Sequence, residues 1–375
     1  KRIAVIGGGP AGLSVAWQLW LKGHEPEIFD RNERLGGKIR DVIPHSRIPA
    51  NVFEHELARV EERVRHTIIT ELDEDLFMDI VNRHEYTVIA VGANDPRTLK
   101  VEGAPRAMSA LDFLKAAKRD KMKVGRRVVV IGAGNVGCDV ATEAYRLGAR
   151  EVTLVDIQRP ASFGRERAAA ESLGARFLWP VRTEAVTAKG VILADGRVVP
   201  ADLVVFSIGD TPDLRFLPDS VDIQGGFVKV DGKYRTSLDT VYAIGDSVRP
   251  GLITDAIGAG RMVAQDIDAR IRGLDETFDR IPAIDPERIR LEYYEPVREP
   301  FPDMESMARA CASCGLCRDC GLCEAVCPQQ AISRRSLQDG KYEYVVDERR
   351  CIGCGFCAGS CPCGIWELRE NDPIG

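Results

Sequence analysis

One short pattern occurs twice in the sequence and limits the fold more than any other feature: an apolar run, a glycine turn and a helix-like segment. In the first copy, apolar residues 3–6 lead into GGGPAG at 7–12, and in the second, residues 128–131 lead into GAGNVG at 132–137. At the G-x-G-x-x-G spacing, one glycine permits the tight turn, the next lets backbone N–H groups reach a pyrophosphate, and the third permits close helix packing. The repeat therefore predicts an α/β chain with two Rossmann-like dinucleotide-binding domains.

An acidic residue follows each copy at the end of the next predicted strand, where a carboxylate can accept hydrogen bonds from an adenosine ribose. A turn without a ligand is the alternative, but strand, motif, helix and acidic residue in register favour nucleotide binding. Two dinucleotide sites in one chain imply electron transfer between two cofactors. The candidate residues are Gly7, Gly9, Ala11, Gly12 and Asp30 in the first site, and Gly132, Gly134, Asn135, Gly137 and Asp156 in the second.

Asp156 bears on the choice of nicotinamide nucleotide at the second site. A carboxylate about 4 Å from a 2′-phosphate is repelled by roughly 1 to 4 kcal/mol, depending on the local dielectric, and this favours NAD(H) over NADP(H). Three nearby arginines, Arg159, Arg165 and Arg167, could reverse that preference by pairing with the phosphate.

The end of the chain is rich in cysteine. Of the twelve cysteines, all but Cys138 lie between residues 311 and 363. Two groups follow the spacing of bacterial iron–sulfur proteins, in which the fourth cysteine ligates the other cluster. This predicts two [4Fe–4S] clusters, the first held by Cys317, Cys320, Cys323 and Cys361, and the second by Cys351, Cys354, Cys357 and Cys327.

Zinc and disulfides are the alternatives for these thiols, but the doubled spacing with proline after each last cysteine is more specific than a zinc ribbon. Cys311, Cys314 and Cys363 remain without an assignment, and we expect residues 337–346 to form a hairpin with an Asp-Gly turn. Cys138 is interpreted as a small buried apolar residue.

The first 275 residues resemble the two-dinucleotide-binding-domain flavoproteins, and among them the glutamate synthase small-subunit group, which includes the large subunit of NADH-dependent ferredoxin:NADP oxidoreductase. The resemblance rests on GGGPAGLS at 7–14, LGGKIRDVIPHSRIP at 35–49, TVIAVGA at 87–93, VVVIGAGNVGCDVA at 128–141, and TVYAIGDSVRPGLITDAIGAGRMVA at 240–264. It implies FAD at the first site and a nicotinamide nucleotide at the second. The tail, about residues 312–370, resembles a two-cluster bacterial ferredoxin.

The resemblance also implies further FAD contacts. Asp246 would bond the ribityl chain, Gly92 would lie at the return from the first domain, and residues 258–261 would begin a helix pointing at the isoalloxazine. The full set of implied FAD contacts outside the glycine turn is Gly36, Gly37, Arg47, Pro49, Gly92, Gly245, Asp246 and Ala256. In contrast to the disulfide reductases of the superfamily, the flavin-proximal part of the chain has no cysteine pair.

These observations divide the chain into four parts: a discontinuous FAD domain (1–105 and 238–275), an NAD(P) domain (106–237), a proline-rich linker (276–305) and a small α+β ferredoxin domain (306–375). We expect electrons to pass between NAD(P)H and the clusters through FAD, and on to a larger redox subunit or a ferredoxin in a hetero-oligomer. The alternatives are a non-catalytic wiring subunit with an unused nucleotide site and a flavin oxidoreductase acting on an organic substrate.

Bulk properties exclude several other classes of function. The net charge of −6 gives no general case for nucleic acid or an anionic membrane. No apolar run approaches the roughly 18 residues of a membrane span, and no signal-peptide pattern precedes the first strand. We therefore expect a cytoplasmic protein without a membrane span.

Overall fold

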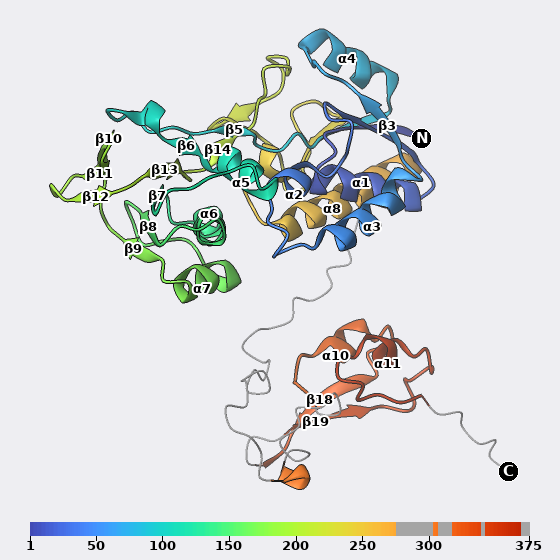
Figure 1. The fold of residues 1–375 in the computed structure, drawn as a ribbon. Coiled ribbons are helices and arrows are strands. Elements are labelled where there is room, and N and C mark those ends of the chain that lie inside the picture. Colours follow the sequence, from blue (N-terminus) through green and yellow to red (C-terminus); the bar gives the residue numbers. More distant parts are fainter. Residues whose placement is uncertain (275–302, 307–316, 339–341, 369–375) are drawn as a thin grey trace. The chain divides into compact units, whose positions relative to one another are not determined.

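The computed structural model forms two compact units, residues 1–276 and 277–375 (Figure 1). It describes the whole chain except residues 275–302, 307–316, 339–341 and 369–375. The predicted linker therefore lies almost entirely outside the described residues, as do Cys311, Cys314 and the expected Asp-Gly turn. No helix in the described part of the chain has the length and apolar character needed to cross a membrane.

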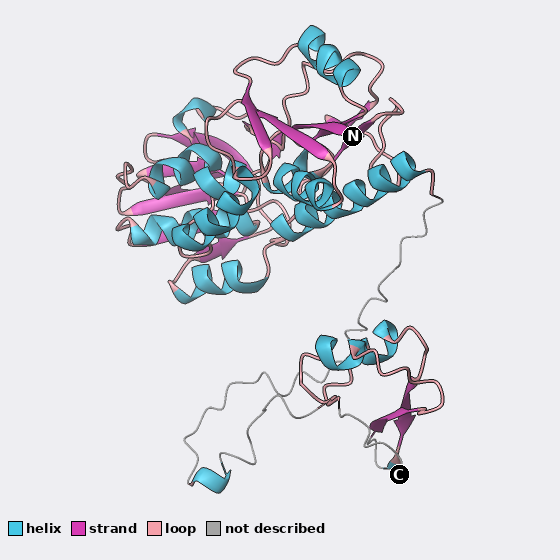
Figure 2. Ribbon diagram, turned by 90° about the vertical axis from the view of Figure 1, so that its right-hand side faces the viewer, coloured by secondary structure: helices cyan, strands magenta, loops and turns pink. Residues whose placement is uncertain are grey.

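The first unit contains two five-stranded parallel sheets, with helices packed against them (Figure 2). The first sheet has the order β17-β4-β1-β2-β3, and the apolar run after Arg2 in β1 is buried at its centre. Its strand from residues 241–243 pairs with β4, so the sheet is completed by a distant part of the chain. The strands are β1 (Arg2–Ile6), β2 (Glu25–Asp30), β3 (Arg65–Ile68), β4 (Tyr86–Ile89) and β17 (Val241–Ala243).

Five helices belong to this first half: α1 (Pro10–Leu21), α2 (Gly37–Asp41), α3 (Ala50–Glu61), α4 (Glu74–Arg83) and α8 (Ile253–Arg272). Helices α1 and α8 pack closely because Gly260 has no side chain: a Cβ there would lie 2.8 Å from the carbonyl oxygen of Ala11. Ser14 Oγ also donates a hydrogen bond to the carbonyl oxygen of Ile257 at 2.8 Å.

The second sheet has the order β6-β13-β7-β8-β9 and repeats the parallel arrangement. Its strands are β6 (Met108–Ser109), β7 (Arg127–Ile131), β8 (Glu151–Val155), β9 (Arg176–Leu178) and β13 (Leu203–Phe206), and its helices are α5 (Ala110–Lys118), α6 (Asn135–Arg146) and α7 (Gly164–Ser172). Cys138 is fully buried among apolar neighbours on α6, as we expected, and burial raises the pKa of its thiol.

Smaller elements complete the first unit. A three-stranded antiparallel sheet precedes β13, and two short pairs, β5 with β14 and β15 with β16, lie in the segments that link the two halves. The bounds are β5 (Asp95–Pro96), η1 (Ala104–Arg106), β10 (Thr183–Thr187), β11 (Gly190–Leu193), β12 (Val198–Pro200), β14 (Asp210–Thr211), β15 (Ile223–Gln224), β16 (Phe227–Val228) and η2 (Gly245–Ser247).

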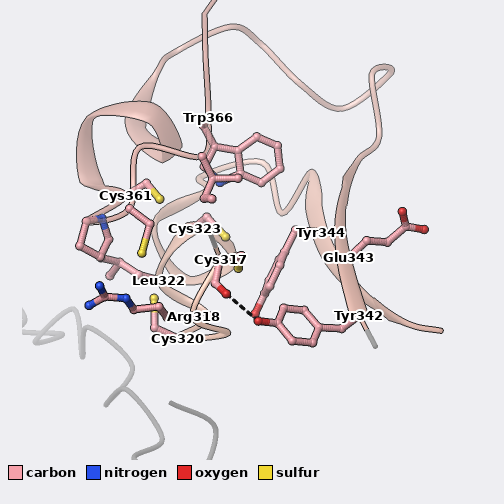
Figure 3. Close-up of a pocket in the computed structure, with 14 residues that line it drawn as sticks. Cys317, Arg318, Cys320, Leu322, Cys323, Tyr342, Glu343, Tyr344, Cys361 and Trp366 are labelled. Atoms are coloured by element: carbon pink, nitrogen blue, oxygen red, sulfur yellow. Dashed lines mark hydrogen bonds between the residues drawn. The ribbon is translucent and has the colours of Figure 1, made fainter. Parts of the chain in front are cut away.

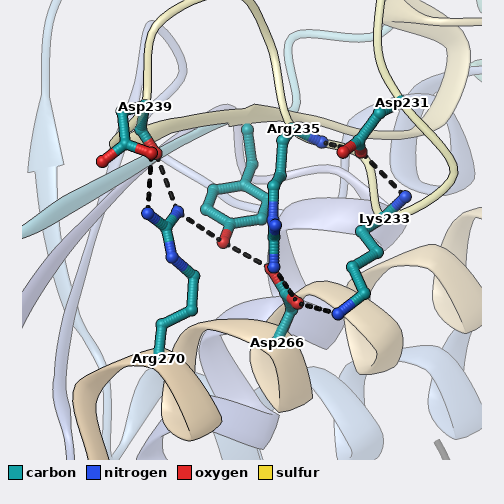
Figure 4. A network of polar contacts seen from close by, with 7 residues as sticks. Asp231, Lys233, Arg235, Asp239, Asp266 and Arg270 are labelled. Carbon is teal, nitrogen blue, oxygen red and sulfur yellow. Dashed lines mark hydrogen bonds and ion pairs between the residues drawn. The ribbon is translucent and has the colours of Figure 1, made fainter. Parts of the chain in front are cut away.

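A buried carboxylate ties α8 to the first sheet (Figure 4). Asp266 on α8 has no exposed surface, and it accepts hydrogen bonds from Arg235 at 2.6 and 2.7 Å and from the Tyr242 hydroxyl at 2.6 Å. Lys233 Nζ lies 3.2 Å from the same carboxylate. A buried charge needs such partners, so this network fixes α8, β17 and residues 233–235 together.

In the second unit, two short helices and a hairpin are described: α10 (Leu322–Val326), β18 (Ile332–Ser336), β19 (Tyr342–Val346) and α11 (Phe356–Ser360). The hairpin has the register Arg334 opposite Tyr344. Its first strand ends at residue 336, before the segment 337–346 that we expected to hold the whole hairpin. The chain is therefore α/β, with two Rossmann-like halves followed by a small α+β domain, as predicted.

Candidate cofactor and cluster sites

The first glycine turn joins β1 to α1 and contains two kinds of glycine. Gly7 has φ +107°, and a Cβ there would lie 2.3 Å from the Ala90 carbonyl oxygen; a Cβ at Gly12 would lie 1.9 Å from the Gly7 carbonyl oxygen. Gly9 is different, because a Cβ there would meet no atom within 4 Å. Gly7 and Gly12 are thus required by backbone packing, whereas Gly9 leaves open space beside the N-terminus of α1, where a pyrophosphate fits.

Asp30, at the end of β2, is held against this turn. Its Oδ2 accepts a hydrogen bond from the Gly8 N–H at 2.6 Å, and its Oδ1 accepts one from the Asn32 N–H at 2.8 Å. The carboxylate therefore lies beside the glycine turn in a fixed orientation. Its bond to a ribose remains a prediction.

The second turn, between β7 and α6, repeats the geometry of the first. A Cβ at Gly132 would lie 2.1 Å from the Ser207 carbonyl oxygen and one at Gly137 would lie 2.3 Å from that of Gly132, while Gly134 again faces open space. Asp156 Oδ2 accepts from the Ala133 N–H at 2.8 Å. The two turns are built in the same way and fit the same class of ligand.

The side chain of Asn135, at the start of α6, bonds a neighbouring segment of the chain. Its Oδ1 accepts a hydrogen bond from the Phe163 N–H at 2.9 Å. The contact joins the glycine turn to the segment that leads into α7.

Several distant segments meet at the first turn. A Cβ at Gly37 would lie 2.9 Å from the Gly9 Cα, and a Cβ at Gly245 would lie 3.0 Å from the Ala11 Cβ and 4.0 Å from that of Ala256. Gly36, Gly37, Gly92 and Gly245 all have positive φ, which glycine adopts without strain. The structure thus brings the Gly36-Gly37 segment and Gly245 against the first turn, with Ala256 next to Gly245, an arrangement that fits an extended dinucleotide such as FAD.

Lys38 is a residue of this region that sequence reasoning missed. Its Nζ lies 3.0 Å from Asp210 Oδ2 and 3.3 Å from Asp246 Oδ2. Its position directly after the Gly36-Gly37 pair is the sequence signal that could have identified it as a residue of this site. Lys38 therefore links α2 to η2 and to β14, which begins at Asp210.

Arg47 is directed toward the second half of the unit. Its guanidinium lies 2.7 Å from Asp139 Oδ2 on α6 and 2.5 Å from Glu166 Oε1 on α7. Burial raises the pKa of Asp139 to about 6, although the neighbouring guanidinium opposes the shift. Arg47 thus makes a charged contact between the two halves, whereas its contact with a flavin remains a prediction. Pro49 directly precedes α3 as its N-cap.

The expectation that residues 258–261 begin a helix is wrong. Helix α8 begins at Ile253, and the Asp255 carboxylate accepts a hydrogen bond from the Leu252 N–H at 2.8 Å across its first turn. Residues 258–261 lie inside this helix, where main-chain groups already have intrahelical partners.

In the second unit, the cysteines of the predicted first cluster surround a cavity of about 350 Å³ (Figure 3). Tyr342, Tyr344 and Trp366 form part of its wall. Burial raises the pKa of the Cys317 and Cys323 thiols, that of Cys323 to about 11, so iron binding there releases protons. The four cysteines are Cys317, Cys320, Cys323 and Cys361.

Cys363 also lines this cavity and is only 4% exposed. The sequence left this thiol without an assignment, and the structure places it beside the predicted first cluster. The cavity therefore has five thiols, one more than a four-iron cluster binds.

The cysteines of the second set are less enclosed. Cys351 and Cys354 are exposed, and Cys357 and Cys327 are half-buried. The Ala331 N–H donates to Cys327 Sγ at 3.2 Å, and although desolvation acts to raise it, such backbone N–H groups lower the pKa of Cys327. N–H groups aimed at a sulfur stabilise its thiolate, the form that binds iron.

None of the described cysteines in the two sets forms a disulfide. All ten cysteines among the described residues are free, and no three His, Cys, Asp or Glu side chains there are grouped around the position of one metal ion. The first set instead surrounds a cavity larger than a single ion needs, which fits a multi-iron cluster.

The chain matches the models of two protein families. The model of the pyridine nucleotide-disulphide oxidoreductase family matches residues 1–260, and that of the 4Fe-4S dicluster domain matches residues 316–365. The chain therefore belongs to the pyridine nucleotide-disulphide oxidoreductase family and is a flavoprotein oxidoreductase with a C-terminal iron–sulfur domain.

Curated relatives of the chain are named as chains or subunits of redox enzymes. It is 31% identical over 314 residues to a putative glutamate synthase [NADPH] small chain of Cereibacter sphaeroides, with 71% of this chain and 76% of the relative covered. It is 29% identical to the NADP(+)-dependent formate dehydrogenase subunit beta of Moorella thermoacetica, of which it spans 48%, and 28% identical to the NAD-dependent dihydropyrimidine dehydrogenase subunit PreT of Escherichia coli, of which it spans 69%. These matches cover 76% and 72% of this chain, respectively. The suspected glutamate synthase small-chain relationship is confirmed.

Solved structures support the fold of the first unit. The thioredoxin reductase of T. acidophilum matches with a TM-score of 0.59 at 18% identity, covering 72% of this chain and 98% of that one. A 2-naphthoyl-CoA reductase matches with a TM-score of 0.55 at 20% identity, covering 70% and 39%.

Proposed function

We propose that this protein is an electron-transfer subunit that moves electrons between NAD(P)H and two [4Fe–4S] clusters through FAD. The observation that carries the proposal is the presence, in one chain, of two geometrically equivalent glycine turns and two complete cysteine sets. FAD, when bound, supplies the conversion between the electron pairs of nicotinamide and the single electrons of the clusters.

The chain's own residues hold these groups in place. The open space at Gly9 and the anchored carboxylate of Asp30 receive the FAD pyrophosphate and ribose, and Gly134 and Asp156 do the same for the nicotinamide nucleotide. We expect no side chain to act as acid or base, because hydride transfer between nicotinamide and flavin needs orientation rather than a proton shuttle.

NADH is the proposed nucleotide. The Asp156 carboxylate is fixed beside the second turn by the N–H groups of Ala133 and Gln158, at 2.8 and 3.2 Å, where it would oppose a 2′-phosphate. Arg167, one of the three arginines that could reverse the preference, bonds Glu171 at 2.8 Å and packs over the Phe177 ring. Arg159 and Arg165 remain exposed nearby, and the names of the relatives include both NAD and NADPH.

The terminal partner is proposed to be a larger redox subunit or a ferredoxin, because several relatives are named as chains or subunits of larger enzymes. A wiring subunit with an unused nucleotide site is opposed by the intact geometry of the second turn. A flavin oxidoreductase acting on an organic substrate finds no supporting constellation among the described residues.

Anaerobic titration of the full chain with NADH and, separately, NADPH tests the proposal. We expect NADH to bleach the flavin and reduce the clusters in one titration, with about eight irons per chain. Failure of both nucleotides to reduce the flavin would contradict the proposed function, and faster reduction by NADPH would contradict the role given to Asp156.

A further inference from the structure

The residue before the second cysteine differs between the two cysteine sets, although its backbone conformation is the same in both. The residue before the second cysteine is Asp319 in the first set, with φ 56°, and Gly353 in the second, with φ 69°. Both lie in the left-handed region, which glycine adopts freely and other residues adopt at a cost. A non-glycine residue persists there when its surroundings hold it.

The Asp319 side chain is buried and firmly held. Asp319 is 6% exposed, and its carboxylate accepts hydrogen bonds from Arg334 Nε at 2.8 and 3.0 Å and from the Tyr344 hydroxyl at 2.8 Å. Arg334 and Tyr344 are opposite each other in the β18–β19 hairpin. The carboxylate therefore fastens the Cys317–Cys320 loop to the hairpin.

The hairpin holds the same loop at a second point. The Tyr342 hydroxyl donates to the Cys317 carbonyl oxygen at 2.7 Å, and the Arg334 guanidinium lies 4.8 Å from the centre of the Tyr342 ring (Figure 3 shows the Tyr342 bond). Tyr342 and Tyr344 also line the cavity between the four cysteines. Gly353 has no side chain with which to anchor the second set in this way.

We propose that Asp319 and Arg334 are positioning residues for the first cluster, which hold its Cys317–Cys320 loop and whose opposite charges tune its reduction potential. This inference rests on the proposed function, because it requires both clusters. Cluster potentials respond to nearby charge, hydrogen bonds and exposure. A carboxylate next to the cluster disfavours the more negative reduced state and a guanidinium favours it, and in the intact pair the two effects oppose each other.

The test is an EPR-monitored redox titration of the full chain with its clusters assembled, for wild type, Asp319→Asn, Arg334→Gln and Arg334→Lys. Asparagine tolerates the left-handed conformation and keeps an acceptor oxygen. We expect Asp319→Asn to raise the midpoint of the first cluster and Arg334→Gln to lower it, each by at least a threefold change in the ratio of oxidised to reduced cluster at a fixed potential. Arg334→Lys should return the midpoint toward the wild-type value.

A charge effect shifts the first-cluster midpoints of Asp319→Asn and Arg334→Gln in opposite directions. A loosened loop would shift both midpoints in the same direction. Asp222→Asn is the control, because Asp222 is an exposed carboxylate of the first unit that pairs with Lys229; neither midpoint should move. Loss of the first cluster in Arg334→Gln with retention in Arg334→Lys also supports the positioning role. Unchanged midpoints, or shifts of the same sign, in variants that hold both clusters overturn the inference. Failure of the proposed function is distinct, since wild type itself would then lack two EPR signals or show no flavin reduction by either nucleotide.

Discussion

At the scale of single residues, each glycine turn contains glycines required for backbone packing and one glycine that leaves room for a ligand. Gly7, Gly12, Gly132 and Gly137 each face a backbone oxygen that leaves no room for a Cβ, whereas Gly9 and Gly134 face open space. The packing roles follow from the spacing alone and were predictable from the sequence. The chain therefore offers substitutions that test binding without testing the fold.

We expect Gly134→Ala to leave the fold and the bound flavin intact while raising the KM for NADH at least tenfold, because the added methyl occupies the pyrophosphate space. Steady-state diaphorase kinetics and flavin content measure both effects. Gly137→Ala is the contrasting variant, since its Cβ meets the Gly132 carbonyl oxygen and should lower the unfolding temperature. An unchanged KM in Gly134→Ala would show that no nucleotide lies against this turn.

Asp156→Ser is expected to shift the ratio of kcat/KM for NADH over NADPH toward NADPH by roughly fivefold or more, because the repulsion it removes is about 1 to 4 kcal/mol. The measurement is the kcat/KM of the variant for each nucleotide. Asp222→Ser, which removes an exposed carboxylate elsewhere on the unit, should leave the ratio unchanged. Equal ratios in wild type and Asp156→Ser would remove Asp156 from nucleotide selection.

At the scale of elements, the contact between the two halves of the first unit combines one arginine with two acids. Arg47 reaches Asp139 on α6 and Glu166 on α7, and Asp139 is buried. Burial disfavours the charged form of the Asp139 carboxylate, and the nearby Arg47 guanidinium offsets only part of this effect. The contact is therefore sensitive to pH.

Because the folded-state pKa of Asp139, about 6, lies above the usual 3.8, the folded state binds the proton more tightly. The free energy of unfolding should therefore fall as pH rises from about 4 to about 6. Asp139→Asn removes this dependence, so we expect the variant to exceed wild type in stability at pH 8 by up to about 3 kcal/mol. At pH 4 the two should be similar. Urea unfolding across pH measures this, and a constant difference between the two proteins would contradict it.

The elements also show where sequence reasoning reached its limit. The Rossmann-like strands and helices were predictable because apolar runs and glycine spacing are local signals. The start of α8 was predicted too late in the chain, although Asp255 at the third helical position, which accepts from the Leu252 N–H, is a local signal of a helix start. The partners of Arg47 are more than ninety positions away in sequence, and no local pattern encodes such a contact.

At the scale of the whole molecule, the cysteine spacing predicted a first set of four ligands, and Cys317, Cys320, Cys323 and Cys361 line one cavity although the last is far along the chain. The position of Cys363 in the same cavity was not predictable, because the spacing rule says nothing of extra thiols.

The exchange of fourth cysteines between the sets gives a specific expectation. Cys361→Ser should weaken or abolish the EPR signal of the first cluster and leave that of the second, and Cys327→Ser should do the reverse. The same signal lost in both variants would refute the crossed assignment. Iron content in the two variants provides the second measurement.

The completion of the first sheet by β17 and α8 has a consequence for synthesis. The second sheet has its last strand when residue 206 has emerged from the ribosome, but the first sheet lacks an edge strand until residue 243, and Asp266 has yet to meet Arg235. The chain order of the strands therefore allows the reverse of the usual order, in which the N-terminal part of a chain folds first. The later-encoded half can finish folding while the N-terminal half still waits for its closing strand and helix.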